Sequence, residues 1–330
     1  MAKKKIINKS KIHGLVLLKS APVKEKSDDS TYTFESVDQE NKIKLTHELV
    51  PYGASYRYSV LLVNESLAPI TEIKVRIKFP EFLTITRVSP TTISIAPQLD
   101  ESGAKQINLE IDELSETSEN QINLYFKPLL LNKKGEIHTN VTYVNNKDFI
   151  RVIDSDPAEI NIIEPEIEGK IISSSKIAGF LKTKGIKKAI KSLGIATKRK
   201  KNMALYFDHI EQLLGLHKFQ LITKDDNKKI AWFFGMDLNT KEDILVIGQI
   251  VSNKIEFLAA SQHHPGLISL LTMLSNEFKK RILSIGKIKS IDKIYELECK
   301  YCGAVFDRFP KKGESIECKN KNCNRSQTVW

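Results

Sequence analysis

All four cysteines of this 330-residue chain lie in its last 32 residues. Cys299 and Cys302 form a C-x2-C pair, and Cys318 and Cys323 follow after fifteen residues as a C-x4-C pair. Two close pairs joined by a connecting segment can bring four thiolates to the corners of a tetrahedron, as a structural zinc site requires. Two disulfides or an iron–sulfur centre would use the same residues, although a reducing cytosol disfavours disulfides. We therefore expect one structural Zn2+ ion.

A segment this short needs such an ion, because about 35 residues cannot build an adequate hydrophobic core, whereas structural zinc supplies roughly 10–16 kcal/mol of folding free energy. Four sulfur ligands leave no open coordination position, so the ion is expected to hold the fold and not to catalyse. The motif resembles a zinc ribbon, predicted over residues 292–330. The resemblance implies a module of nucleic-acid machinery or of protein interaction, and the basic and aromatic side chains nearby serve either contact with nucleic acid or a small soluble core.

Charge is unevenly distributed along the chain, whose formal net charge is +11. Residues 1–27 carry eight Lys and one Glu, residues 28–168 carry 13 basic and 24 acidic side chains, and residues 169–207 carry 11 basic and no acidic side chains. Such separation indicates contact of particular segments with polyanions or an anionic surface, with solubility alone as the other explanation. Residues 1–29 are predicted to be a basic, disordered segment.

An acidic β-sandwich is predicted over residues 30–165, because apolar and polar side chains alternate there with a period of two. In the clearest strand, Ile73, Val75, Ile77 and Phe79 share one face, and charged side chains share the other. Several such runs, separated by Pro, Gly, Asn and Ser, are typical of an antiparallel immunoglobulin-like sandwich. The multidomain fold begins with this all-β module.

A cationic linker is predicted over residues 166–202. Ile186, Ala189, Ile190 and Leu193 fall on one side of a short amphipathic helix at 100° per residue. The segment would lie on an anionic membrane, neutralise nucleic-acid phosphates, or simply connect two domains, and the sequence leaves these alternatives open. The side chains predicted to bind an anionic surface are Lys182, Lys184, Lys187, Lys188, Lys191, Lys198, Arg199, Lys200 and Lys201.

A small α+β module is predicted over residues 203–285. A helical period from Met203 is followed by alternating runs at 229–238, 243–251 and 254–260. Pro265 then begins a second helix with an apolar stripe. The expected order is helix, three-stranded antiparallel sheet, helix.

Several short stretches of both modules are similar to the appendage, or ear, of vesicle-coat adaptors, especially that of the coatomer gamma subunit. In the sandwich, Leu61-Leu62-Val63-Asn64-Glu65 precedes the alternating strand at 73–79. In the second module, a helix ending Leu213-Leu214-Gly215-Leu216-His217 precedes Ala231-Trp232-Phe233-Phe234-Gly235 and then Asp243-Ile244-Leu245-Val246. The order resembles the gamma-coatomer platform. The cationic linker and the cysteine-rich end depart from that pattern, so no peptide-docking residue is carried over.

The resemblance implies a non-enzymatic adaptor that binds short peptide motifs of partner proteins at an anionic membrane surface. The absence of a phosphate-binding loop and of nucleophile motifs agrees with a protein that is not an enzyme and has no small-molecule substrate. A cytoplasmic location is expected, with peripheral membrane association, because no apolar stretch is long enough to span a bilayer. The alternative is a nucleic-acid-binding zinc-ribbon protein, related to transcription or RNA, whose sandwich is an interaction arm.

Overall fold

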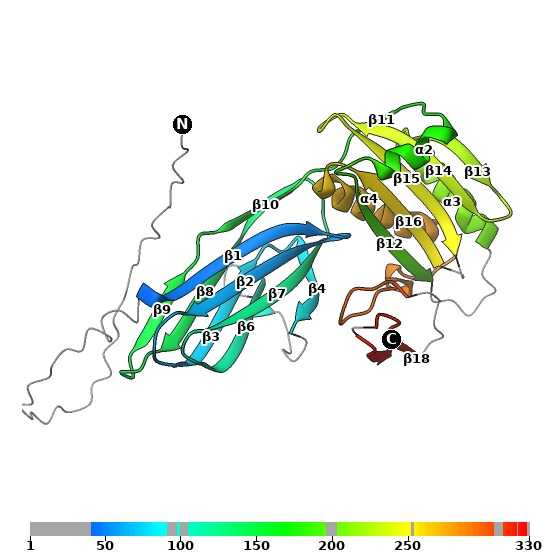
Figure 1. Ribbon diagram of the computed structural model, residues 1–330. Helices are drawn as coiled ribbons and strands as arrows, with labels where there is room; N and C mark the ends of the chain where they lie inside the picture. Colours follow the sequence, from blue (N-terminus) through cyan, green and yellow to red (C-terminus); the bar gives the residue numbers. More distant parts are fainter. Residues whose placement is uncertain are drawn as a thin grey trace, which may run out of the picture.

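The computed structural model describes residues 41–90, 98–99, 105–195, 203–251, 254–306, 313–321 and 323–328. The predicted disordered segment 1–29 lies outside the described residues, as do Lys198, Arg199, Lys200 and Lys201. Two folded modules lie end to end in Figure 1, and the C-terminal segment lies beside the strand β12 of the second module.

The first module is a sandwich of two antiparallel sheets. One sheet has the order β1-β2-β7-β4, and the other has the order β10-β8-β3-β6-β5, with β9 paired to β8. The strands are β1 Ile43–Tyr52, β2 Ser55–Asn64, β3 Ile70–Phe79, β4 Leu83–Ser89, β5 Gln98–Leu99, β6 Lys105–Leu114, β7 Ser118–Pro128, β8 Lys133–Val144, β9 Ile150–Asp154 and β10 Ala158–Ile162.

The two sheets pack against each other through the inward-facing side chains of their alternating strands. Ile73, Val75, Ile77 and Phe79 of β3 are all buried, as the alternation predicts. The order β1-β2-β7-β4 opposite β10-β8-β3 matches the A-B-E-D and G-F-C sheets of an immunoglobulin sandwich. An immunoglobulin-like sandwich is therefore confirmed for this module.

The second module is built on one seven-stranded antiparallel sheet of order β11-β14-β15-β16-β12-β17, in which β13 also pairs with β14. Helices α3 and α4 cover one face, and α2 packs on the other through Ile177. The elements are β11 Ile167–Gly169, α2 Ser174–Lys182, β12 Lys187–Ile195, α3 Met203–Leu216, β13 Gln220–Asp225, β14 Ile230–Asp237, β15 Glu242–Val251, β16 Lys254–Ser261, α4 His264–Ser284 and β17 Ile294–Glu296.

The predicted linker with its short helix is wrong as a description of residues 186–193. Residues 187–195 form strand β12, which lies between β16 and β17, while the flanking β11 and α2 also belong to the second module. Ala189 and Leu193 face the helices, and Lys191 between them is buried against Glu296. Because a buried lysine interrupts the apolar alternation of this strand, the sequence pattern favoured a helix. The predicted three-stranded meander and its two helices are present, but the sheet is larger than expected.

Helix α4 joins the two modules. Its Ile268 is fully buried in the core of the sandwich, while Leu267, Leu270 and Leu271 are buried in the core of the second module. Asn276 of the same helix donates a hydrogen bond to the Leu129 carbonyl at 3.2 Å. One helix therefore contributes to two cores, which fixes the position of the sandwich relative to the sheet.

Candidate metal centre and adjoining cleft

The four cysteines meet at one point near the C-terminal end of the chain. Their Sγ atoms all lie within 4.8 Å of one another, with 3.4 Å between Cys302 and Cys318 and 3.8 Å between Cys299 and Cys323. A tetrahedral ion with bonds of about 2.3 Å to sulfur separates its ligands by about 3.8 Å, whereas a disulfide bond is about 2.05 Å long. The cluster therefore could bind a metal ion and contains no disulfide.

Two tight turns position the sulfur atoms. After Cys299, the Gly303 N–H donates to the Cys299 carbonyl at 2.8 Å, and Gly303 has a φ of 74°, which glycine adopts without strain. On the second arm, Cys318 follows β18 (Ser315–Glu317), which pairs with β19 (Ser326–Thr328). The Cys323 N–H donates to the Asn320 carbonyl at 2.8 Å. These turns explain why C-x2-C and C-x4-C spacings converge.

The environment of the cysteines affects their ionisation in opposite directions. Burial raises the pKa of the Cys318 thiol to about 12. Burial also opposes ionisation of Cys302, but the backbone N–H of Ala304 and the side chains of Cys318 and Asn320 outweigh it and lower the pKa to about 7. A buried thiol such as that of Cys318 ionises readily only beside a cation, as a metal ligand does.

A buried ionic network attaches the cysteine-rich segment, residues 296–328, to both modules. Lys127 of the sandwich, whose side chain is 5% exposed, forms ion pairs with Glu296 and with Glu298, the latter at 2.6 Å. Lys191 of β12 lies 2.8 Å from the other oxygen of Glu296. Burial opposes the charged form of Lys127, but the two carboxylates outweigh it and raise its pKa. The network holds the start of the cysteine-rich segment where the sandwich meets β12.

A second buried lysine attaches the same segment to the sheet. Lys254 of β16 donates to the Phe306 carbonyl at 2.6 Å and lies 2.8 Å from Glu256. Burial disfavours the ionised Glu256, but Lys254 and Ser192 outweigh it and lower the pKa of this carboxyl. Both attachments place a cationic side chain beneath the segment and leave its outer surface accessible.

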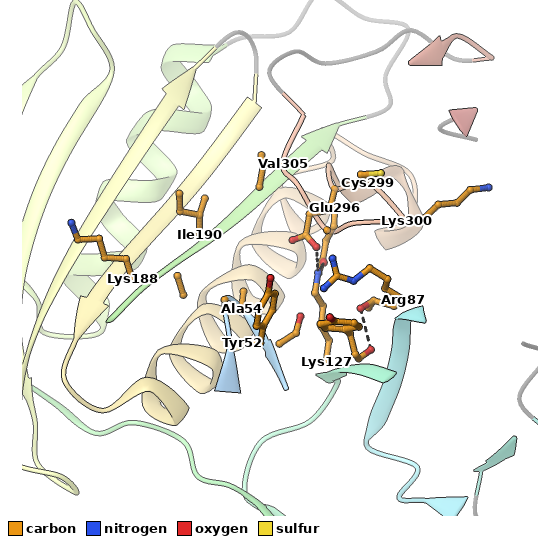
Figure 2. A pocket seen from close by; sticks show the side chains of 17 residues that line it. Tyr52, Ala54, Arg87, Lys127, Lys188, Ile190, Glu296, Cys299, Lys300 and Val305 are labelled. Atoms are coloured by element: carbon orange, nitrogen blue, oxygen red, sulfur yellow. Dashed lines mark hydrogen bonds and ion pairs between the residues drawn. The ribbon is translucent and has the colours of Figure 1, made fainter. Parts of the chain in front are cut away.

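A cleft of about 440 Å³ opens where the sandwich, β12 and the cysteine-rich segment meet (Figure 2). The walls come from the β1–β2 turn, from β4 and β7, from residues 188–190 of β12, and from residues 296–305. Lys127 and Glu296 lie at its base, already paired with each other. Three other charged side chains of the lining have no acidic partner among the described residues, and all three are cations.

Arg87 lies at the centre of this cleft. Its guanidinium lies 3.5 Å from the ring centroid of Tyr125 and 5.7 Å from that of Tyr52. Lys188 and Lys300 stand on opposite sides of the cleft with their amino groups directed outward (Figure 2). Among the described residues, no carboxylate lies within 4.0 Å of any of these three cations. The cleft therefore presents three cations without counter-charges beside exposed aromatic surface.

A second pairing of cations with a ring extends from the cleft over the cysteine cluster. The Lys300 amino group lies 5.1 Å from the ring centroid of Tyr301, and the Arg325 guanidinium lies 5.0 Å from the same centroid. Lys319 and Lys321 are exposed close by in sequence. The cysteine cluster thus supports a surface on which cations and rings alternate toward the cleft.

The structure separates the cations that the sequence analysis grouped together. Lys182 and Lys184 are exposed at the end of α2, and Lys187 is exposed on β12. Lys188 lines the cleft, whereas Lys191 is buried and paired with Glu296. Of the predicted surface-binding set, the described residues therefore contribute one side chain to the cleft.

Four side chains of this region were missed by the sequence analysis: Tyr52, Arg87, Tyr125 and Lys127. They come from strands whose outward positions carry many polar residues, and no spacing links them to the cysteines. A site assembled from five separate segments leaves no local signal.

The fold and the site define a protein in which an immunoglobulin-like β-sandwich is joined to an antiparallel α+β module and to a terminal four-cysteine cluster that could bind a metal ion. No family model matches the chain, and no curated protein matches its sequence. Within the described residues, no helix is both long and apolar enough to cross a membrane.

Several solved structures align weakly. A cohesin module from a family 33 glycoside hydrolase of Clostridium perfringens shares 9% identity over 37% of this chain and 97% of that chain, with a TM-score of 0.29. An uncharacterized protein of Nocardia farcinica with an immunoglobulin-like fold shares 11% identity over 36% of this chain and 97% of that chain, with a TM-score of 0.27. BcpA, the major pilin subunit of Bacillus cereus, shares 13% identity over 64% of this chain and 59% of that chain, with a TM-score of 0.29. At such scores, none of these similarities carries an argument about this chain.

Proposed function

We propose that this chain is a non-enzymatic nucleic-acid-binding protein whose contact surface is formed by the zinc-stabilised C-terminal segment, by β12 and by Arg87 of the sandwich. One observation carries the proposal: Lys188 of the basic segment and Lys300 of the cysteine-rich segment line the same cleft. Cations that lack acidic partners gain free energy when they displace the counterions of a phosphate backbone. A basic surface shared by these two segments favours nucleic acid over the other partners considered.

The aromatic side chains support the same partner. Tyr301 lies between Lys300 and Arg325, and Arg87 stacks on Tyr125. Proteins that bind single strands combine a cationic groove for the phosphates with rings on which bases stack. Arginine adds a planar guanidinium that bonds a phosphate through two N–H groups.

Zinc fits the cysteine cluster as its structural ion. Four sulfur donors at tetrahedral separations suit zinc, and they leave no coordination position for a substrate. Cys299, Cys302, Cys318 and Cys323 would hold the ion, and the ion would hold the turn that carries Lys300 and Tyr301. Its role is therefore to position cations and rings.

A protein-binding adaptor is the second candidate. Apolar side chains also line the cleft, namely Ala54, Ile190 and Val305, and Ile190 is 40% exposed. A short peptide of a partner protein could bury such side chains, as the resemblance to vesicle-coat appendages implies. The charged lining is less well explained by this candidate, because the apolar side chains are few and scattered around the cations.

The experiment is a fluorescence anisotropy titration of a labelled 20-nucleotide oligo-dT with the zinc-loaded full chain at about 0.05, 0.1 and 0.2 M salt. Each phosphate neutralised on a single strand contributes about −0.7 to the slope of log K against log salt. We expect binding that weakens with a slope of about −2 or steeper. The double variant Lys300→Gln, Arg325→Gln should reduce both affinity and slope.

The control is Lys228→Gln, which removes an exposed lysine from the turn between β13 and β14. It should leave affinity and slope unchanged. A selection from a random 12-residue peptide library, displayed on phage, is run in parallel to test the adaptor. Enriched peptides together with an absence of oligonucleotide binding would replace nucleic acid by a protein partner.

A further inference from the structure

We infer that the cleft is the place where this protein distinguishes single strands from duplexes: one unpaired base stacks on the exposed ring of Tyr52, while Arg87, Lys188 and Lys300 contact the phosphates beside it. The inference rests on the proposed function and names the form of nucleic acid and the residues that select it. It depends on the geometry of the cleft and not on the cysteine cluster.

Tyr52 is the side chain best placed for stacking. It stands at the end of β1, where the chain turns into β2, and it is 48% exposed although it is a large aromatic residue. The Tyr125 ring lies 5.4 Å away at an interplanar angle of 67°, and this edge-on contact braces the Tyr52 ring. One face of a braced, exposed ring is a stacking platform that accepts any base.

Arg87 places a fixed cation beside the Tyr52 ring. Its guanidinium is held on the face of Tyr125, and a Cβ added to Gly303 would lie only 2.7 Å from its Nη1 atom. The cation is thereby fixed between the sandwich and the cysteine-rich turn without a carboxylate to neutralise it. A fixed guanidinium loses little conformational freedom when it bonds a phosphate.

The positions of the two lysines fit a ligand that crosses the cleft. Lys188 and Lys300 lie on opposite sides with their amino groups directed outward (Figure 2). To bind one small anion, the two amino groups would have to point toward each other. An extended strand that crosses the cleft instead has phosphates on both sides of it. The two lysines would each contact one of those phosphates.

A duplex is poorly suited to this site for two reasons. Its bases are paired and stacked inside, so none can stack on the Tyr52 ring without flipping out. The sandwich beside the cleft carries a net negative charge, because residues 43–162 hold 16 acidic and 12 basic side chains. A rigid duplex lying across it would be repelled over a long stretch, whereas a flexible single strand can bend into the cationic cleft.

The test compares a labelled 20-nucleotide oligo-dT with a 20-base-pair duplex of mixed sequence, using the zinc-loaded full chain. We expect the single strand to bind at least about tenfold more tightly. Tyr52→Ala should weaken single-strand binding about fivefold or more, the lower end of the range for loss of one stacked base. Arg87→Gln should lower the salt slope by about 0.7, and Lys188→Gln with Lys300→Gln should lower it by about 1.4.

Phe149→Ala is the matched control. Phe149 also has an arginine over its ring, with 5.4 Å between the Arg151 guanidinium and the ring centroid, but it lies in the β8–β9 turn at the far end of the sandwich. Its removal should change neither affinity nor the preference for single strands. Circular dichroism of every variant separates loss of a contact from loss of fold.

Ultraviolet cross-linking of the oligo-dT complex, followed by mass spectrometry, locates the contact. We expect a cross-linked peptide that contains Tyr52. Cross-links confined to the cysteine-rich segment, together with unchanged affinity in Tyr52→Ala, would overturn the inference and leave the proposed function standing. Equal affinity for duplex and single strand would overturn it as well. If neither nucleic acid binds, the proposed function fails and this inference fails with it.

Discussion

Gly303 and Arg87 meet at the boundary between the cysteine cluster and the sandwich, where a Cβ on the glycine would lie 2.7 Å from the Nη1 atom of the arginine. Gly303 also has a φ of 74°, in the left-handed region that glycine adopts most easily. One residue therefore satisfies two demands: the turn that positions Cys302 and the close approach of a cation from another module. The metal centre and the cleft are linked through this contact.

We expect Gly303→Ala to destabilise the cysteine-rich segment by more than its backbone conformation alone requires. The left-handed conformation costs an alanine about 1–2 kcal/mol. The added Cβ would also displace the Arg87 guanidinium from the Tyr125 ring, which costs roughly 0.5–1 kcal/mol more. Gly313→Ala is the control, because Gly313 has the same φ of 74° and nothing lies within 4 Å of an added Cβ. Thermal unfolding of both variants measures the difference. Equal losses of stability would show that the Arg87 contact is unimportant.

Removal of zinc should unfold the cysteine-rich segment and spare the sandwich. A structural zinc ion would supply most of the folding free energy of this segment, whereas the sandwich has a hydrophobic core of its own. We expect one zinc per chain by elemental analysis, and less than stoichiometric zinc in Cys318→Ser. Limited proteolysis after chelation should cleave beyond residue 297 first. A chelated chain with unchanged proteolytic resistance there would contradict a structural role for the ion.

Lys127→Met should destabilise the protein by about 3 kcal/mol, because it leaves Glu296 and Glu298 with less counter-charge in a mostly buried network. The comparison is Lys134→Met. That lysine forms an exposed ion pair with Glu159, at 64% and 66% side-chain exposure, and its loss should cost less than about 1 kcal/mol. Denaturant unfolding of both variants is the measurement. If the two losses are alike, the network does not anchor the segment.

Glu296 should make the stability of the protein depend on pH below the usual carboxyl range. Burial disfavours its ionised form, but the charges of Lys191 and Lys127 outweigh burial and lower its pKa. Its stabilising contribution is therefore present above the unfolded pKa of about 4.3 and is lost as the pH falls toward the folded pKa.

The comparison for this pH dependence is Glu296→Gln, which keeps the same cysteine ligands, so that acid release of zinc affects both proteins. We expect wild type to be the more stable protein at pH 7 and the two unfolding free energies to converge as the pH falls below about 4. A difference that stays constant from pH 7 to pH 3 would be evidence against the assigned ion pairs.

The sequence predicted those elements whose pattern is local. The alternation from Ile73 to Phe79 identified a strand of the sandwich because its polar positions all face solvent. The cysteine spacing identified the cluster because two short turns suffice to bring each pair together. In both cases the residues that determine the structure lie within a few positions of one another.

The elements that escaped prediction depend on contacts between distant residues. Lys191 lies in the middle of strand β12. Its burial is explained by an ion pair with Glu296, which lies more than a hundred residues later. The cleft unites Tyr52, Arg87, Lys188 and Lys300 from four parts of the chain. No periodicity relates such residues, so the binding surface emerges only when the modules are in place.

The central claim is that the metal centre holds a cationic surface against the cleft so that nucleic acid can bind. The most direct measurement is the affinity of the full chain for a labelled 20-nucleotide oligo-dT at about 0.1 M salt, with the zinc-loaded protein and again after chelation. We predict at least a tenfold loss of affinity without zinc, reversed when zinc is restored. Equal affinity in the two states, or no binding in either, would contradict the account.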